Sequence, residues 1–253
     1  MVQVPQRTAL SGPALIRLLA RLTDHDVAES SQSLSDRLSQ WLGWTDAISL
    51  SSALSGNPPA VPASARGFGR AEEDECVRVR SLLAKAITGD SLLAGSKRRG
   101  PVSASASAQS GSVDAPPDYA VFRQRYVAQQ QSMETAVGNL RGRLRGMLAT
   151  RTPAMARLAV VDAVMERALS ERERNLLASV PGLLGGHFER LRDASQKAHA
   201  DHVEDPDASQ DAIPVPPGAW LDVFRKDMQS VLLAELEVRL QPVEGLLAAL
   251  RTR

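Results

Sequence analysis

Residues 118–150, DYAVFRQRYVAQQQSMETAVGNLRGRLRGMLAT, decide the fold of this chain. Side chains that can enter a core recur here at spacings of four and three residues, which is the period of one face of an α-helix. A helix with such a long seam is expected to pack along its whole length against other helices. The seam consists of Phe122, Tyr126, Gln129, Met133, Val137, Leu140, Leu144 and Met147.

The residues that follow predict that the chain turns back on itself. Thr152 can cap a new helix, and Pro153 suits its first position. Residues 180–182, Val-Pro-Gly, are expected to kink or end this return helix. We therefore predict an extended antiparallel helical hairpin within residues 118–199. The inner face of its second helix would carry Leu158, Val161, Met165, Leu169 and Leu176.

The rest of the chain divides into helical blocks and connectors. Stretches rich in Pro, Gly, Ser or acidic residues lack apolar periodicity and predict linkers, of which the second is expected to be disordered. The linkers are 56–69, 95–117 and 200–218, and the blocks are an N-terminal helical segment 1–55, a helix 70–94, the hairpin core 118–199 and a C-terminal helix 219–253. Pro242 should kink or split that last helix. The predicted fold class is all-α, with the N-terminal helices and the C-terminal helix packed on the long hairpin.

Composition restricts the classes of partner. Thirty basic and twenty-nine acidic residues give a formal net charge of +1, so the chain as a whole has no field that would draw it to nucleic acid or to a membrane. No stretch approaches about 18 apolar residues, which predicts that no segment spans a bilayer. Cys76 is the single cysteine, so no intramolecular disulfide can form. This pattern fits a reducing compartment, and we expect a cytoplasmic protein.

Patterns with catalytic chemistry are not found. Residues 89–97, GDSLLAGSK, lack the spacing of a phosphate-binding loop, and the His, Asp and Glu residues between 199 and 207 fit no metal-ligand spacing. We therefore predict no catalytic residue, no cofactor and no metal. Trp41 and Trp44 are interpreted as core anchors.

Three glycines supply the candidate partner-binding site. Gly138, Gly142 and Gly146 fall at about 0°, 40° and 80° around the helix, whereas the apolar seam centres near about 220°. Each glycine inside a helix costs roughly 0.5–1 kcal/mol relative to alanine. Close approach of another helix, from this chain or a partner, would offset that cost. The alternative is that the glycines lie on an exposed face and have no packing role. Arg141 and Arg145 flank the glycines and complete the candidate site.

Three segments also resemble a known family. ALSGPALIRLLARL, WLGWTDAISLSSAL and YAVFRQRYVAQQQSMETAVGNLRGRLR are similar to an uncharacterised bacterial family that is classified as a domain of unknown function. The resemblance covers most of the chain and implies no activity, ligand or catalytic residue. It implies a role beside a machine of the cell envelope.

The leading functional prediction is a non-catalytic interaction or scaffold protein that dimerises or docks a helical partner. The alternative is a nucleic-acid-associated protein, because ten arginines and five acidic residues lie between 121 and 174. That reading would use Arg123, Arg141, Arg143 and Arg145. The acidic residues that interleave with arginines at 166–174 favour a solvated, mutually paired surface instead.

Overall fold

The computed structural model describes residues 13–23, 33–56, 69–95, 118–204 and 218–252, and all regular secondary structure among them is α-helical. The predicted all-α class is confirmed. The helices are α1 (Ala14–Thr23), α2 (Leu34–Trp41), α3 (Trp44–Ser55), α4 (Arg70–Thr88), α5 (Tyr119–Ala149), α6 (Pro153–Leu177), α7 (Val180–Glu204) and α8 (Ala219–Arg251). Among these described residues, no helix combines the length and the apolar character needed to cross a bilayer.

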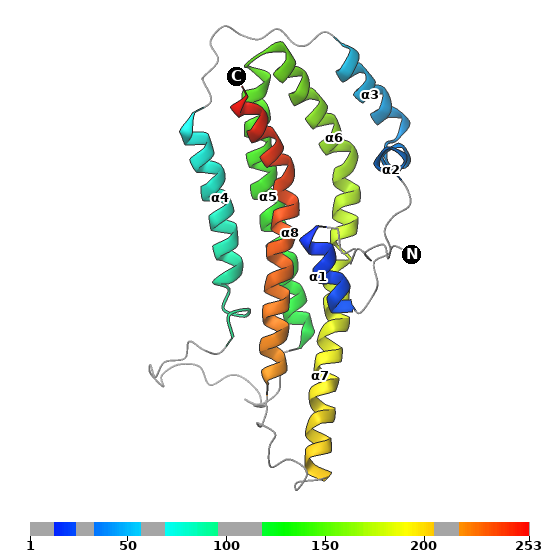
Figure 1. Cartoon of the computed structure of the whole chain (residues 1–253), viewed down its shortest axis with the longest axis vertical. Helices are drawn as coiled ribbons and strands as arrows, with labels where there is room; N and C mark the ends of the chain where they lie inside the picture. The colour runs from blue at the N-terminus through cyan, green and yellow to red at the C-terminus, as the bar shows by residue number, and fades with distance from the viewer. Residues whose placement is uncertain (1–12, 24–32, 57–68, 96–117, 205–217, 253) are drawn as a thin grey trace, which may run out of the picture.

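The centre of the structure is the pair of long helices α5 and α8. Each contributes a continuous line of buried apolar residues, and these two helices make the most extensive contacts between any two elements. Figure 1 shows α8 in front of α5, with α4 on one side of the pair and α6 on the other. Helix α1 packs against α7 and α8, with Leu15 and Leu22 buried.

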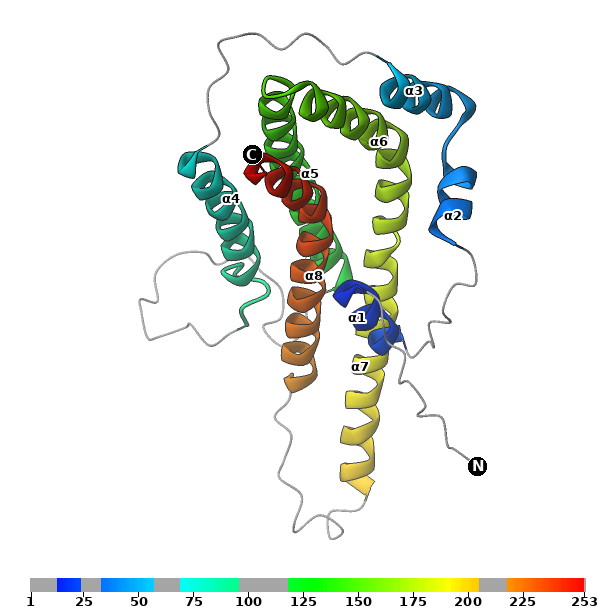
Figure 2. The same ribbon diagram turned by 45° about the horizontal axis from the view of Figure 1, so that its top comes forward.

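Helices α6 and α7 carry the chain back from the end of α5. Thr152 accepts a hydrogen bond from the Met155 amide and Pro153 occupies the first turn, as their sequence predicts. Figure 2 shows α6 curving away from α5 before α7 continues in the opposite sense to α5. The break lies between Leu177 and Val180, and Pro181 follows in the first turn of α7. Gly185 lets the Tyr119 ring pack closely, because a Cβ atom there would lie 2.9 Å from that ring.

An aromatic cluster packs the N-terminal parts of α5, α7 and α8 together. The ring centroids of Phe122, Phe188 and Phe224 lie between 5.0 and 5.9 Å apart. Tyr119 and Trp220 extend the cluster at both sides. Burial raises the pKa of Tyr119 to about 12, so its hydroxyl stays protonated and donates a hydrogen bond to the Pro181 carbonyl.

Two positions of the predicted α5 seam were wrong by one residue. The buried residues are Gln130 and Leu148, whereas Gln129 and Met147 are half-buried. The amide of Gln129 instead reaches the end of α4, where it donates to the Ala86 carbonyl of that helix and to Asp90 in the turn that follows.

The predicted inner face of the return helix was wrong at two of its five positions, while Val161, Met165 and Leu169 are half-buried. Leu158 and Leu176 are exposed, while the residues of α6 that are buried are Ala156, Ala159, Val164 and Leu177. The reason is that α6 packs against α5 on one side and α3 on another, so it has no single apolar face.

Several predicted boundaries move. The helix predicted over 70–94 ends at Thr88, and a turn that contains Asp90 follows it. Helix α7 extends to Glu204, into the linker that was predicted over 200–218. Helix α8 is not split at Pro242, because Leu240 and Val243 on either side of that proline are both buried in the core. Residues 57–68, 96–117 and 205–217, which make up most of the predicted linkers, lie outside the described residues.

The aromatic cluster generates a stability prediction. Phe224→Ala should lower the free energy of unfolding by about 3–5 kcal/mol, because it removes a fully buried ring and leaves a cavity. Its neighbour Val223 is exposed, and Val223→Ala should change stability by only about 0.5 kcal/mol. Urea denaturation of both variants measures the difference. Equal losses would contradict the cluster's role.

Candidate functional site

The outward face of α5 carries the three predicted glycines within a longer uncharged strip. The residues of the strip span an arc of about 100° around the helix. All are exposed except Gly142, which is half-buried. A Cβ atom added at any of the three glycines would meet no heavy atom within 4 Å, so the described part of the chain leaves this backbone uncovered. We call this face the α5 strip, and it comprises Val121, Gln124, Ala128, Gln131, Thr135, Gly138, Asn139, Gly142 and Gly146.

The two arginines of the predicted site point away from the strip, towards α6. Arg141 donates to both carboxylate oxygens of Asp162, at distances between 2.7 and 3.2 Å. Arg145 donates to Asp162 at 3.1 Å and also to Glu166. All four side chains are partly buried. The structure therefore places Arg141 and Arg145 beside the glycines, where they fasten α5 to α6.

A second line of arginines fastens α5 to the other side. Arg143 donates to Glu75 of α4 at 2.8 Å, and Arg125 pairs with the buried Asp90 at 3.1 Å. Hydrogen bonds from Arg143 and Arg78 hold the pKa of the Glu75 carboxyl below its usual range. Five of the six charged residues of α5 thus pair with α4, its following turn or α6, and none of the six lies on the strip.

The strip continues into a hollow at the N-terminal half of α5. The hollow has a volume of about 570 Å³ and lies between α5 and the turn that follows α4. Leu92 and Val121 give it apolar walls, and Val121 is exposed. Its other lining residues are Ser91, Gln124, Arg125 and Ala128. Three of the lining residues belong to the α5 strip, so the hollow and the glycines form one continuous surface.

A buried polar network lies on the opposite side of α5. Glu235 of α8 is 0% exposed and accepts hydrogen bonds from Tyr126 at 2.8 Å and from Gln130 at 3.0 and 3.1 Å. Arg239, one turn further along α8, donates to Glu235 at 2.9 Å. Burial, and then the negative charge of Glu235, raise the pKa of the Tyr126 hydroxyl far above its usual range, so Tyr126 remains a donor.

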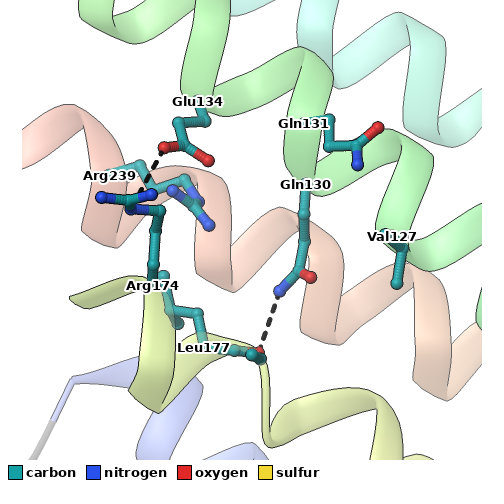
Figure 3. Close-up of a pocket in the computed structure, with 8 residues that line it drawn as sticks. Val127, Gln130, Gln131, Glu134, Arg174, Leu177 and Arg239 are labelled. Atoms are coloured by element: carbon teal, nitrogen blue, oxygen red, sulfur yellow. Dashed lines mark hydrogen bonds and ion pairs between the residues drawn. The ribbon is translucent and has the colours of Figure 1, made fainter. Parts of the chain in front are cut away.

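The network also meets the break between α6 and α7. The amide of Gln130 donates to the Leu177 carbonyl at 3.0 Å, which satisfies an acceptor at the end of α6. Beside it is a small pocket of about 170 Å³, and Figure 3 shows Arg174, Arg239 and Glu134 gathered at one side of it. Arg174 pairs with Glu134 at 3.7 Å, and Arg239 with Glu173 at 3.6 Å. The charges around this pocket are therefore paired within the chain, as expected for a structural junction.

This network was not predicted, although the sequence of α8 contains a signal for it. Within the apolar stretch VLLAELEVRL of α8, Glu235 and Arg239 are spaced by four residues and so share a helix face. Apolar residues fill the helical turns on both sides of this pair, and that pattern predicts that the pair lies inside the core.

The two tryptophans do not anchor the core. Trp41 is half-buried, with the Arg172 guanidinium 4.7 Å above its ring centroid. Trp44 is 82% exposed, so its interpretation as a core anchor was wrong. Helix α3 is apolar on more than one side, and its main contacts among the described elements are with α6, which leaves Trp44 largely uncovered by the described residues.

The first prediction from the site concerns Glu235. Glu235→Gln should lower the free energy of unfolding by about 3–5 kcal/mol, because it leaves the buried Arg239 without its main counter-charge. Glu237→Gln is the matched control, since Glu237 is half exposed and pairs with Arg80 at the surface. The control should cost below about 1 kcal/mol in the same urea titration. Similar losses in both variants would show that the buried network is not a main determinant of stability.

The second prediction concerns the glycines. Gly142→Ala should raise the free energy of unfolding by about 0.5–1 kcal/mol, because alanine has the higher helix propensity and its Cβ would meet no neighbouring atom. Thermal unfolding of the isolated chain at low concentration measures this gain. A loss of stability would mean that another part of the chain covers the strip.

Comparison with known proteins agrees with the resemblance noted in the sequence. Residues 1–252 match the family described as protein of unknown function (DUF3348), and the chain belongs to this family. No curated protein and no solved structure matches the chain.

Proposed function

We propose that this chain is a non-catalytic scaffold protein that docks a helix of a protein partner on the α5 strip. The observation that carries the proposal is the uncovered backbone at Gly138, Gly142 and Gly146. Three glycines within one helix cost roughly 2–3 kcal/mol in total relative to alanine. No contact within the described chain offsets this cost, whereas a partner helix in close contact would offset it.

The surroundings of the strip also favour a protein partner. Exposed helix faces usually carry charged residues, and here every charged residue of α5 is displaced to the flanks. The ion pairs on the flanks hold α5 between α4 and α6, so that α5 and α6, the two predicted arms of the hairpin, act as a rigid platform. A rigid, uncharged and small-residue face suits a helix that binds through close packing.

The geometry argues against the nucleic-acid alternative. That reading uses Arg123, Arg141, Arg143 and Arg145 to contact phosphates, but the last three are already bound to carboxylates of this chain. Binding a phosphate would first require these pairs to break. The proposed scaffold function uses the same residues as structural ties and needs no such rearrangement.

Gly142→Leu tests the proposal. The leucine should block association while leaving the fold intact, because its side chain would enter open space within this chain and clash only with a docked helix. The measurement is the solution mass by light scattering, together with the melting temperature. If the native chain is monomeric, the capture of partners from cell extract by the native and variant chains replaces the mass measurement.

Gly142→Ala is the matched control for folding and helix propensity. It should weaken association less than Gly142→Leu does, because a methyl group intrudes less into a close helix contact. If association of Gly142→Leu equals that of the native chain, the α5 strip is not the docking site. Salt-sensitive retention of the native chain on DNA would support the nucleic-acid alternative instead.

A further inference from the structure

We propose that the helix docked on the α5 strip is α3 of a second copy of this chain. The inference rests on the proposed function, because it names the occupant of the same strip. It starts from an independent observation, which is the uncovered apolar side of α3.

The exposed side of α3 carries large apolar residues. Trp44 is 82% exposed, Leu54 is 55% exposed and Ile48 is 51% exposed. We call these three residues the α3 ridge. An exposed tryptophan is unusual, and tryptophan is among the residues that most often dominate the free energy of protein–protein association. Ile48, one turn after Trp44 on the same side of α3, extends the exposed apolar surface beyond a single side chain.

The rest of α3 explains why the ridge remains free. No residue of α3 is buried, and the helix packs against α6 of its own chain through other residues. Asp46 is the one charged residue of α3 and lies 4.0 Å from Arg167 of α6. Arg157 of α6 donates to the Gly56 carbonyl just after α3. These contacts turn the charge and the helix end towards α6, away from the ridge.

The shapes of the ridge and the strip are complementary. Trp44 and Ile48 are four residues apart and form one of the i, i+4 ridges by which helices pack. Gly138, Gly142 and Gly146 form an i, i+4 row without side chains, which is a groove in the same geometry. Ridges of this class fit such grooves at a crossing angle of about −50°. The pair Trp44 and Ile48 spans roughly 6 Å along α3 and fits within the glycine row, which spans roughly 12 Å.

The charges of the two surfaces are also compatible. Neither the ridge nor the strip contains a charged residue, in a chain of which 23% of the residues are charged. Burying either surface therefore strands no charge. The net charge of +1 means that two copies repel each other only weakly. A neutral groove and a neutral ridge on one chain fit each other better than either fits a charged partner.

The arrangement requires two copies. Within one chain α3 packs on α6, and nothing described lies within 4 Å of the added Cβ positions in the groove. When the ridge of each copy enters the strip of the other, two-fold symmetry closes the assembly and forms both contacts at once.

Disulfide trapping tests the contact directly. Two differently tagged chains, both with Cys76→Ser, carry Ile48→Cys and Gly142→Cys respectively, and are mixed and oxidised with oxidised glutathione. The proposal expects a disulfide between the two chains, because ridge and groove bring these positions within the 4.4–6.8 Å Cα separation that a disulfide needs. The matched control replaces Ile48→Cys with Leu176→Cys, an equally exposed apolar position that lies off the ridge. Equal trapping in both mixtures would overturn the proposal.

Solution mass separates this inference from the proposed function. The native chain should have twice the chain mass of 27.2 kDa. Trp44→Ser and Gly142→Leu should each weaken the dimer at least about tenfold, while Leu176→Ser should not. Trp44 is almost fully exposed, so its substitution leaves the fold intact, which the melting temperature checks.

The other outcomes are equally informative. A dimer that is lost in Gly142→Leu but kept in Trp44→Ser would overturn α3 as the occupant and retain the α5 strip as the docking site. A native monomer at all accessible concentrations would overturn the second copy as the partner, and the proposed function would then depend on a different protein.

Discussion

The carboxylate of Glu235, which is withdrawn completely from water, joins three parts of this structure. Because water cannot reach this carboxylate, its oxygens need hydrogen-bond donors from the protein. Tyr126 and Gln130 of α5 and Arg239 of the same helix supply them. Gln130 then bonds to the end of α6. A buried charge is costly unless all its hydrogen bonds form together, so this network specifies the register of α5 on α8 and the point at which α6 ends. The break that gives α7 its separate direction is therefore part of the core.

Much of the fold could be predicted from the sequence because it follows from local rules. The apolar period of α5, the Thr152 cap with Pro153 and the apolar period of α8 each need only neighbouring residues to be recognised. The glycines and their flanking arginines were placed on the correct sides of α5 by the same helical period. What the period could not show is that Arg141 and Arg145 would meet Asp162 and Glu166, since that depends on the register between two helices.

The wrong predictions have a common physical origin. Where a helix has two faces of similar polarity, the contacts with other helices decide which face is buried. Gln129 and Gln130 are the same residue type one position apart, and the burial of Gln130 goes with its partners Glu235 and Leu177, which no local pattern reveals. Trp44 was assigned to the core because large apolar residues usually are, but α3 has apolar residues on two sides and α6 is its main neighbour among the described helices. The local pattern of a helix does not reveal how many other helices will pack against it.

The distribution of charge connects the fold to the proposed role. Most of the ionisable groups around α5 form ion pairs with groups on neighbouring elements. None of the charged residues of α5 lies on its outward face, which leaves a neutral strip. In the proposed role, stability and docking use different side chains, because the flanks hold α5 in place while the glycines between them are left open by the described chain. A helix that needed its arginines for a ligand could not be fastened in this way.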